Sequence, residues 1–489
     1  MPKHVTWATM SWSLALLLAA CSTLNQPDSS AVLRQAEQAM GGAGLKSVQF
    51  TTQGGGGTFG QAYVPGMAWP TLRYSVLTRL ADYQNAALRE EFGRARAEPT
   101  GGGAAPLLGG GEQRAVALLR DNLAWNLAGP NALPAPVALD ERIHDLWTTP
   151  HGVLKAAQRN GATASRRSEG DRSFVALSFT EPGRFSATVL INEKNLVERI
   201  ESRRPHPVAG DTDVVTTFSD YRDFNGLMFP GRIQQNQGSF DVLDLTVLDV
   251  KANVPLDIAI PDSVRGATER AAAEKAADGV WYITGGTHHS VLIEMTDHLI
   301  LVESPLYDGR ANAVFAEARR LAPGKPLRYV INSHHHFDHA GGLRAAAAEG
   351  ATLVTSAMAR PYLESTLANP NRISPDALAR SGRKASIVGV RGMREFSDGS
   401  RRVEVYELEG SIHATGFLMV YLPDQMLLIE ADAYTPTAPG MPPPPVPNAN
   451  NVNLVQNIER LNLAVERILP LHGRMVPLSE LYAAIGRKP

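Results

Sequence analysis

From about residue 276 onward, short apolar runs alternate with longer amphipathic stretches. The runs GVWYITGG, HHSVLIEMTD and HLILVES follow one another closely, and each is typical of a strand. A helical pattern (309–322), a strand pattern (327–332), a second helical pattern (341–349) and another strand, ATLVTS, come next. Because strands and helices alternate, we predict an α/β fold for this part of the chain.

The alternation continues to the end of the chain. FLMVYLP and QMLLIEA are typical of buried strands, and a proline-rich loop (435–450), a helical pattern (451–466) and the strand ERILPLHGR follow them. The predicted α/β domain therefore covers residues 276–489.

Residues 31–270 have a different pattern. SFVALSF, FSATVLIN and LVERIESR are short β-rich runs with short connections, which predict an antiparallel sheet. The segment 112–128 and the alanine-rich segment 267–278 have helical patterns, whereas the glycine runs at 54–57 and 101–111 predict flexible loops. We therefore predict an α+β, antiparallel-sheet domain. Its pattern resembles the curved half-barrels of lipoprotein-carrier and lipoprotein-sorting domains.

The N-terminus, MPKHVTWATMSWSLALLLAACS, has the layout of a secretory signal. Its apolar stretch, Val5 to Ala20, is too short to span a membrane comfortably. LAAC resembles a bacterial lipobox, in which the cysteine is lipidated and becomes the mature N-terminus; the alternative is a plain signal peptide with a chance cysteine. We predict a lipoprotein signal peptide over residues 1–20, lipidation at Cys21 and a polar tether over 21–30.

Ser22, rather than aspartate, follows that cysteine, and in lipoproteins this favours the outer membrane. We therefore expect the protein in the bacterial cell envelope, facing the periplasm. The net charge of −2 gives no global field that attracts nucleic acid or acidic lipid. We expect a small-molecule substrate, no nucleic-acid partner and attachment to the membrane through the lipid. Cys21 is the single cysteine, so the mature chain has no disulfide and no further thiolate for a metal.

The segment INSHHHFDHAGG (331–342) places four histidines and an aspartate between His334 and His339, at the end of a predicted strand. In an α/β sheet this is where ligands bind. Zinc takes imidazole nitrogen and carboxylate oxygen, usually from four ligands. Two histidines at i and i+2 on an extended turn can face one metal, and Asp338 and His339 can face a second. Further ligands must come from distant segments.

Three such residues follow at strand edges or in loops. His413 lies in EGSIHATGF, Asp432 follows LLIEA and His472 follows ILPL. In this order and spacing the residues resemble the signature of the metallo-β-lactamase superfamily, His-x-His-x-Asp-His with a later His, Asp and His, over about 276–489. The resemblance implies an αββα sandwich with two zinc ions, iron or manganese being possible alternatives.

The resemblance also assigns a role to each residue. The first metal would be held by His334, His336 and His413, the second by Asp338, His339 and His472, and Asp432 would bridge both. A hydroxide between the metals would be the nucleophile, because zinc lowers the pKa of bound water toward about 7. Asp338 would also orient this hydroxide, which makes it the candidate catalytic residue.

Several nearby residues have two interpretations. Glu303 stands where the family usually has an aspartate, and we expect it to orient a ligand; Glu430 competes with Asp432 as the bridge. His335 should point away from the metals, exposed or behind a ligand. The remaining candidates are ordinary surface, hairpin or salt-bridge residues, or else they line the substrate cleft: His288, His289 and Arg474. Surface positions are expected for His144, His151 and His206.

A bridging aspartate is typical of the thioester-, lactone- and phosphodiester-cleaving branches of the family. The sequence therefore favours hydrolysis of an ester, lactone or thioester, with β-lactam hydrolysis as the alternative. A hypothesis of another class is a lipid or lipoprotein carrier whose C-terminal half binds metal without catalysis.

The lipobox predicts that Cys21→Ser releases the protein from the membrane fraction or blocks signal processing, because the lipid would be the only attachment. Fractionation and gel migration of the variant beside wild type measure this. A variant that fractionates and migrates like wild type would refute the lipid anchor.

Overall fold

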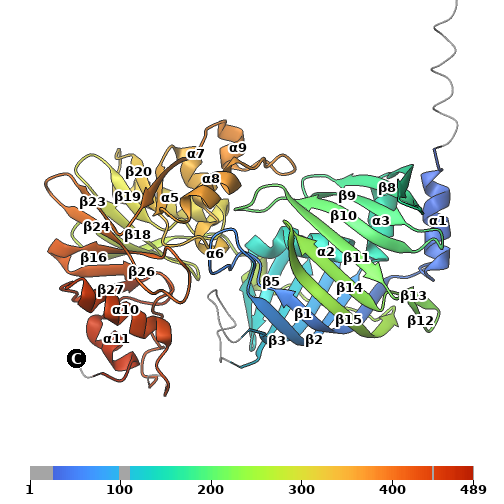
Figure 1. Cartoon of the computed structure of the whole chain (residues 1–489), viewed down its shortest axis with the longest axis horizontal. Coiled ribbons are helices and arrows are strands. Elements are labelled where there is room, and N and C mark those ends of the chain that lie inside the picture. Colours follow the sequence, from blue (N-terminus) through green and yellow to red (C-terminus); the bar gives the residue numbers. More distant parts are fainter. Residues whose placement is uncertain (1–25, 99–110, 443–444, 488–489) are drawn as a thin grey trace, which may run out of the picture.

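The computed structural model describes residues 26–98, 111–442 and 445–487. The predicted signal peptide, Cys21 and most of the second glycine run lie outside these residues. Two regions lie side by side: an antiparallel sheet with few helices, and an α/β region (Figure 1). Both predicted fold classes are confirmed. Among the described residues, no helix combines the length and hydropathy needed to cross a membrane.

The N-terminal region is built on one sheet of thirteen strands, in the order β6-β5-β4-β3-β2-β1-β15-β14-β11-β10-β9-β8-β7. Each strand pairs antiparallel with its neighbours, so β1 and β15, which are far apart in sequence, lie together near the centre. The strands are β1 (Ser47–Gly57), β2 (Thr71–Asp82), β3 (Ala87–Arg96), β4 (Gln113–Arg120), β5 (Leu123–Ala128), β6 (Asn131–Pro134), β7 (Thr163–Glu169), β8 (Arg172–Glu181), β9 (Phe185–Ile191), β10 (Val197–Arg204), β11 (Thr212–Ser219), β14 (Arg232–Gln237) and β15 (Phe240–Ala252). A separate small hairpin joins β12 (Arg222–Phe224) to β13 (Leu227–Phe229).

Helices pack against this curved sheet, with α1 at its far end (Figure 1). They are α1 (Ser29–Ala39), α2 (Leu139–Trp147) and α3 (Gly152–Arg159), with the short η1 (Pro136–Ala138) and α4 (Asp262–Arg265) nearby. The apolar side chains of α1, α2 and α3 form one core with inward residues such as Phe50 and Leu245. A cavity beside these two residues and Phe218 holds about 30 Å³, roughly the volume of one water molecule.

The helix predicted over 112–128 is wrong, because the segment forms the β4–β5 hairpin. Its two turn residues, Asp121 and Asn122, have φ values of 50° and 59°, as a two-residue hairpin turn requires. Pairing of β4 with β3 then outweighs the helical propensity of the alanine- and leucine-rich sequence. The helical pattern over 267–278 is likewise wrong, since Ala272–Ala277 is the edge strand β16.

The glycine run 54–57 is not a flexible loop but the end of strand β1. The register of β1 against β2 shifts between Thr52 and Gly54, and β15 approaches β1 closely at Gly54. A Cβ atom on Gly54 would lie 2.1 Å from the carbonyl oxygen of Asp244. Glycine is therefore needed for the close approach of two strands, and not for flexibility.

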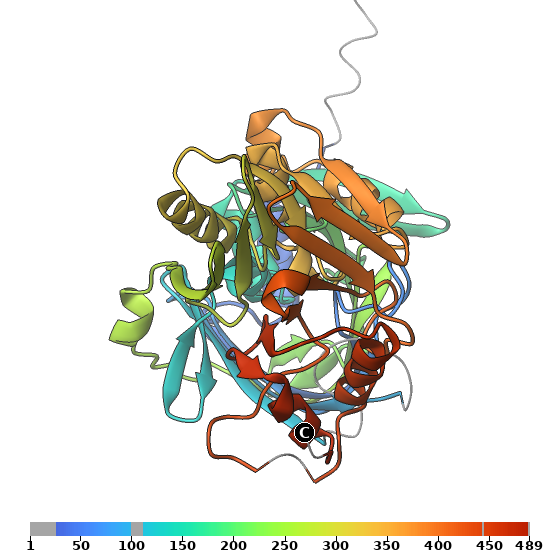
Figure 2. The ribbon, with the colours of Figure 1, turned by 90° about the vertical axis from the view of Figure 1, so that its left-hand side faces the viewer.

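The C-terminal region consists of two sheets packed face to face, with helices outside each (Figure 2). The first sheet contains β16, β17 (Val280–Thr284), β18 (Ser290–Glu294), β19 (Leu299–Val302), β20 (Leu327–Ile331), β21 (Thr352–Ser356) and β22 (Ser386–Val390). The second contains β23 (Met393–Ser397), β24 (Arg402–Glu407), β25 (Leu418–Leu422), β26 (Leu427–Glu430), β27 (Arg467–Pro470) and β28 (Val476–Pro477). The helices are α5 (Asp308–Leu321), α6 (Phe337–Ala340), α7 (Leu343–Glu349), α8 (Arg360–Ala368), α9 (Ala377–Ser381), η2 (Pro423–Gln425), α10 (Ala449–Arg460) and α11 (Leu478–Ala484).

The buried side chains of strand β18 show how this region is divided into layers. Val291 and Ile293 face the core between the two sheets, whereas Leu292 faces the core beneath the outer helices. A strand that is buried on both faces is a continuous apolar run, as the sequence shows. Strands β19 to β22 are parallel, and their carboxyl ends meet at one edge of the first sheet.

The two regions meet at the loop between β1 and β2, residues 58–70, which lies against α6 (blue in Figure 1). Phe59 and Trp69 of this loop pack their rings against Phe337, with centroids 5.3 and 5.7 Å apart. His206 adds a ring 4.8 Å from Phe337. Buried side chains of both regions thus belong to one hydrophobic cluster.

His144 and His151 are buried, so the prediction of surface positions is wrong for both. Nε2 of His151 lies 3.1 Å from the carbonyl oxygen of Met40, and its ring stacks on Phe229. Burial lowers the pKa of His151 to about 4. The folded protein therefore holds this histidine neutral at a pH where the unfolded chain, with a pKa of about 6.5, is protonated.

We expect the free energy of unfolding to fall as the pH is lowered from about 6.5 to 4, because the unfolded chain then binds more protons. His151→Gln should flatten this dependence, by on the order of 3 kcal/mol across the window. Urea unfolding of both proteins at pH 7 and pH 4.5 measures the difference. An identical pH dependence in the variant would show that His151 does not contribute.

Candidate metal centre

The histidine cluster lies where β20 ends. The backbone N–H of Asn332 still donates to Val354 of β21, but the next N–H, of Ser333, donates instead to Oε1 of Glu303 at 2.6 Å. The chain leaves the sheet here, remains extended as far as His336 and then coils into α6. His334 and His336 therefore share an extended segment, and Asp338 and His339 lie on the first turn, as predicted.

A close contact holds this turn in place. The N–H of Leu306 donates to the carbonyl oxygen of Asp338 at 2.7 Å. A Cβ atom on Gly341 would lie 1.8 Å from the carbonyl oxygen of Leu306, so any side chain there would push the loop away. Glu303 and Leu306 have φ values of 69° and 67°, a strained conformation for residues with side chains. Strain in the loop after β19 thus accompanies the positioning of the ligands.

A first group of donor atoms consists of Nε2 of His334, Nδ1 of His336, Nε2 of His413 and Oδ2 of Asp432. The three nitrogens lie 3.0–3.2 Å apart, and Oδ2 of Asp432 lies 2.9 Å from His413 and 3.5 Å from His334. Zinc binds such atoms at about 2.0–2.2 Å, which places tetrahedral ligand atoms roughly 3.3–3.6 Å apart. The spacing of the group is close to this value.

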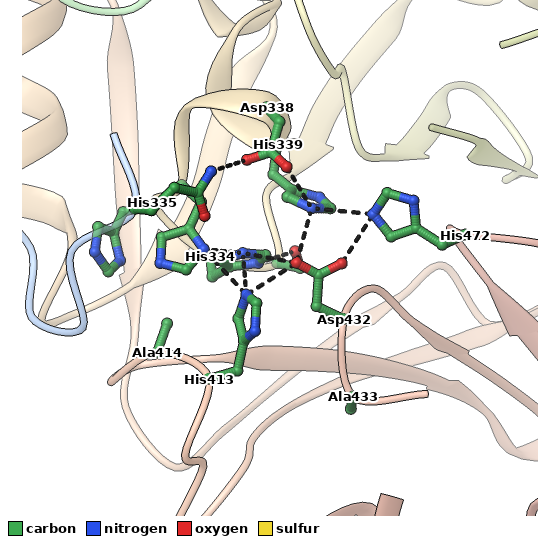
Figure 3. A network of polar contacts seen from close by, with 12 residues as sticks. His334, His335, Asp338, His339, His413, Ala414, Asp432, Ala433 and His472 are labelled. Carbon is green, nitrogen blue, oxygen red and sulfur yellow. Dashed lines mark hydrogen bonds and ion pairs between the residues drawn. The ribbon is translucent and has the colours of Figure 1, made fainter. Parts of the chain in front are cut away.

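A second group lies on the other side of Asp432 (Figure 3). Oδ1 of Asp432 is 2.8 Å from Nε2 of His472, which is 3.4 Å from Nε2 of His339. Oδ2 of Asp338 lies 3.8 Å from the same nitrogen of His339. Oδ2 of Asp432, which faces the first group, also lies 3.2 Å from Nε2 of His339. Asp432 therefore contacts both groups, as a bridging carboxylate must.

Most of these histidines have a hydrogen-bond partner for the ring nitrogen that faces away from the group. Nδ1 of His334 meets the hydroxyl of Ser333 at 2.9 Å, and Nδ1 of His472 meets the carbonyl oxygen of Thr287 at 3.1 Å. Nε2 of His336 meets the carbonyl oxygen of Ala62 at 3.0 Å. Such partners fix the tautomer of metal-binding histidines, so that an unprotonated nitrogen faces the metal.

The residues therefore fit a metal ion. Because Nε2 of His336 donates to the carbonyl oxygen of Ala62, its Nδ1 carries no proton, and this Nδ1 lies 3.0 Å from Nε2 of both His334 and His413. A cation among these three nitrogens would stabilise their close approach. Burial lowers the pKa of His334 and His336 well below the usual value and so favours the neutral, metal-binding form. Burial opposes charge on His339 too, but Asp432 and Asp338 raise its pKa well above the usual value. This cluster is typical of a metallo-beta-lactamase metal site.

Two buried glutamates support the centre from behind. Glu303 accepts the N–H of Ser333, and its Oε2 lies 3.6 Å from Nδ1 of His339, consistent with the predicted orienting role. Oε2 of Glu430 accepts the N–H groups of Ala433 and Tyr434 at 3.0 and 2.9 Å. Glu430 thus holds the turn that carries Asp432 and belongs to neither group, so the competing interpretation of Glu430 as the bridge loses support.

The structure also shows where His335, Arg474 and His289 lie. His335 points away from the groups, as expected, and its buried ring nitrogen Nε2 lies 2.8 Å from the carbonyl oxygen of Ala62. Arg474 forms an ion pair with Glu480. His289 packs on Tyr282 outside both groups.

Sequence reasoning missed the position of His288. Its Nε2 lies 3.3 Å from Oδ2 of Asp338, and its donor atom clusters with those of His339 and His472. The pair of adjacent histidines in the β17–β18 hairpin was the available signal, but only the fold shows which member faces the centre. Sequence reasoning also missed Gln61 of the N-terminal region, whose Nε2 donates to Oδ1 of Asp338 at 2.8 Å and which belongs to no motif.

Residues 283–466 match the family described as the metallo-beta-lactamase superfamily. The matched segment includes the ligand candidates from His334 to Asp432 and ends before His472. The C-terminal half of the chain is therefore a metallo-beta-lactamase superfamily domain.

Solved structures with a similar fold include a metallo-beta-lactamase from Pontibacter korlensis, with 18% identity over 44% of this chain and 98% of that chain and a TM-score of 0.34. Two others are the DIM-1 metallo-beta-lactamase (13% identity, 44% of this chain and 96% of that one, TM-score 0.35) and DIM-1 exposed to ceftazidime (13%, 45% and 97%, TM-score 0.34). None of the curated proteins matches the chain by sequence.

We expect wild-type protein to hold about two metal ions per chain, because the donor atoms are too many for one tetrahedral ion. His413→Ala should empty mainly the first group and His472→Ala mainly the second. Elemental analysis of purified protein measures both, with His289→Gln as the control for a neighbouring histidine outside the groups. Wild-type protein without bound metal would end the hypothesis of a metal centre.

Proposed function

We propose that this protein is a dinuclear zinc-dependent hydrolase that acts on a small molecule with an ester, lactone or thioester bond. The observation that carries the proposal is the pair of donor groups that share Asp432, whose carboxylate contacts His413 of the first group and both His339 and His472 of the second. Iron or manganese could replace zinc, since imidazole and carboxylate ligands also suit those metals. A scaffold without catalysis would have no need of such a complete set.

Two bound divalent ions would activate a water molecule and polarise the substrate carbonyl. The protein supplies the orientation. Asp338 has one carboxylate oxygen, Oδ1, fixed by a hydrogen bond from outside the groups, while Oδ2 faces His288 and His339. Burial disfavours the charged form of Asp338, but His339 and His288 lower its pKa well below the usual range. Asp338 is therefore a carboxylate that can orient a water molecule by accepting its proton in a hydrogen bond.

The substrate class rests on Asp432. Aspartate at this position is typical of the thioester-, lactone- and phosphodiester-cleaving branches, and the chain beyond Cys21 contains no cysteine that could replace it. β-Lactam hydrolysis is the alternative. Lipidation of Cys21 would hold the enzyme at the periplasmic side of the outer membrane, within reach of small molecules that enter the cell envelope. Neither net charge nor the site favours nucleic acid.

We expect zinc-loaded protein to hydrolyse members of a panel of lactones, thioesters and esters faster than β-lactams. Asp338→Asn should lower the rate by about 10²-fold or more, because the amide keeps the shape but not the charge. Steady-state kinetics measure this, with Asp297→Asn, an exposed aspartate away from the centre, as the control. Higher rates on β-lactams would establish the alternative, and wild-type rates in Asp338→Asn would exclude a role for Asp338 in catalysis.

A further inference from the structure

The loop 58–70 of the N-terminal sheet reaches into the metal centre of the C-terminal half. The N–H of Phe337, in α6, donates to the carbonyl oxygen of Gly60 at 3.1 Å. On the other side, the N–H of Thr415 donates to the carbonyl oxygen of Tyr63 at 2.9 Å, and the hydroxyl of Tyr63 donates to Ser411 at 2.8 Å. The loop therefore connects the segment that carries His336 and Asp338 with the segment that carries His413.

Backbone of this loop fixes the ring of one ligand candidate. The carbonyl oxygen of Ala62 lies 3.0 Å from Nε2 of His336. A carbonyl oxygen is an acceptor only, so Nε2 must carry the proton and Nδ1 must be free of one. Nδ1 is the atom that faces His334 and His413. The N-terminal region thus sets the tautomer with which His336 can bind a metal.

A side chain of the same loop fixes Asp338. Nε2 of Gln61 donates to Oδ1 of Asp338 at 2.8 Å. A carboxylate accepts only, so the amide nitrogen, and not the amide oxygen, must face it. With Oδ1 held in this way, Oδ2 is the oxygen that turns toward His288 and His339. Gln61 therefore determines which oxygen of Asp338 faces the second group.

The surroundings of Gln61 indicate that the main polar contact of its side chain is the one with Asp338. Its side chain is buried, with 7% of the residue exposed, and among the described residues its Oε1 has no hydrogen-bond partner. The contact with Asp338 is thus the hydrogen bond that orients the amide. Phe59 and Gly60, immediately before it, are held by Phe337 through ring packing and a backbone hydrogen bond. The amide is presented to Asp338 from a rigid segment.

We infer that the N-terminal region is part of the metal centre, with Gln61 as a positioning residue for Asp338 and the carbonyl of Ala62 as the fixing partner of His336. This inference rests on the proposed function, because it needs a metal at the site. It assigns the large N-terminal sheet a chemical role that a separate carrier or spacer would not have.

The test uses the full-length chain and zinc alone as the probe. Gln61→Met keeps the length of the side chain and removes the donor; Gln61→Ala provides a second variant should methionine disturb packing. Gln84→Met, at an exposed position of the β2–β3 turn, is the matched control. Zinc retained against a competing chelator is measured for each protein, together with thermal unfolding of the metal-free form.

We expect both Gln61 variants to lose the second zinc ion at a chelator concentration about 10- to 100-fold lower than wild type, the scale for partners of metal ligands. The first ion and the unfolding temperature of the metal-free form should be unchanged, as in Gln84→Met. If both variants retain two ions like wild type, or lose both ions together with thermal stability, Gln61 does not position Asp338 and the inference is wrong. Wild-type protein that binds no zinc would instead refute the proposed function itself.

Discussion

The structure is organised around a concentration of lone pairs in a buried space. Imidazole nitrogens and carboxylate oxygens approach one another to about 3 Å, and the carbonyl oxygen of Ala62 holds the proton of the His336 ring on the far side. Such an arrangement is costly without a cation and favourable with one. The fold has to supply the energy that holds it together before a metal binds, and it does so through strands that are buried on both faces.

Two buried glutamates, Glu303 and Glu430, hold the backbone segments that carry the ligand candidates. Glu303 adopts a left-handed backbone conformation and is fully buried, yet it is the residue that turns the chain away from β20 and faces His339. Glu430 uses its carboxylate to hold the turn of Asp432, and burial raises its pKa well above the usual value. Both residues cost stability where they stand, which is common where local strain positions functional groups.

Much of this centre could be predicted from local sequence, but little of its surroundings could. The ligand candidates could be predicted because they lie at strand ends or in loops and the first four share one short segment. The β4–β5 hairpin could not, because Asp121 and Asn122 decide its turn within a sequence of helical propensity. Gln61 and Asp338 are 277 residues apart, and no local pattern links an ordinary glutamine to a carboxylate in another region. His288 was visible as a candidate, but its orientation depends on how a hairpin lies against the second sheet.

The same sequence separation bears on how the protein matures. Contacts between residues this far apart form late in folding, because the closure of so long a loop must be offset by structure on both sides. The N-terminal sheet is complete only when β15 has paired with β1. The loop 58–70 connects β1 to β2 in the same part of this sheet. The strands that carry the histidines can pair before then, but His336 and Asp338 acquire their final orientation only when the two regions dock. If the centre binds metal as proposed, loading with metal would depend on the folding of both regions, and a molecule with a misfolded N-terminal sheet would be recognisable by the metal it fails to keep.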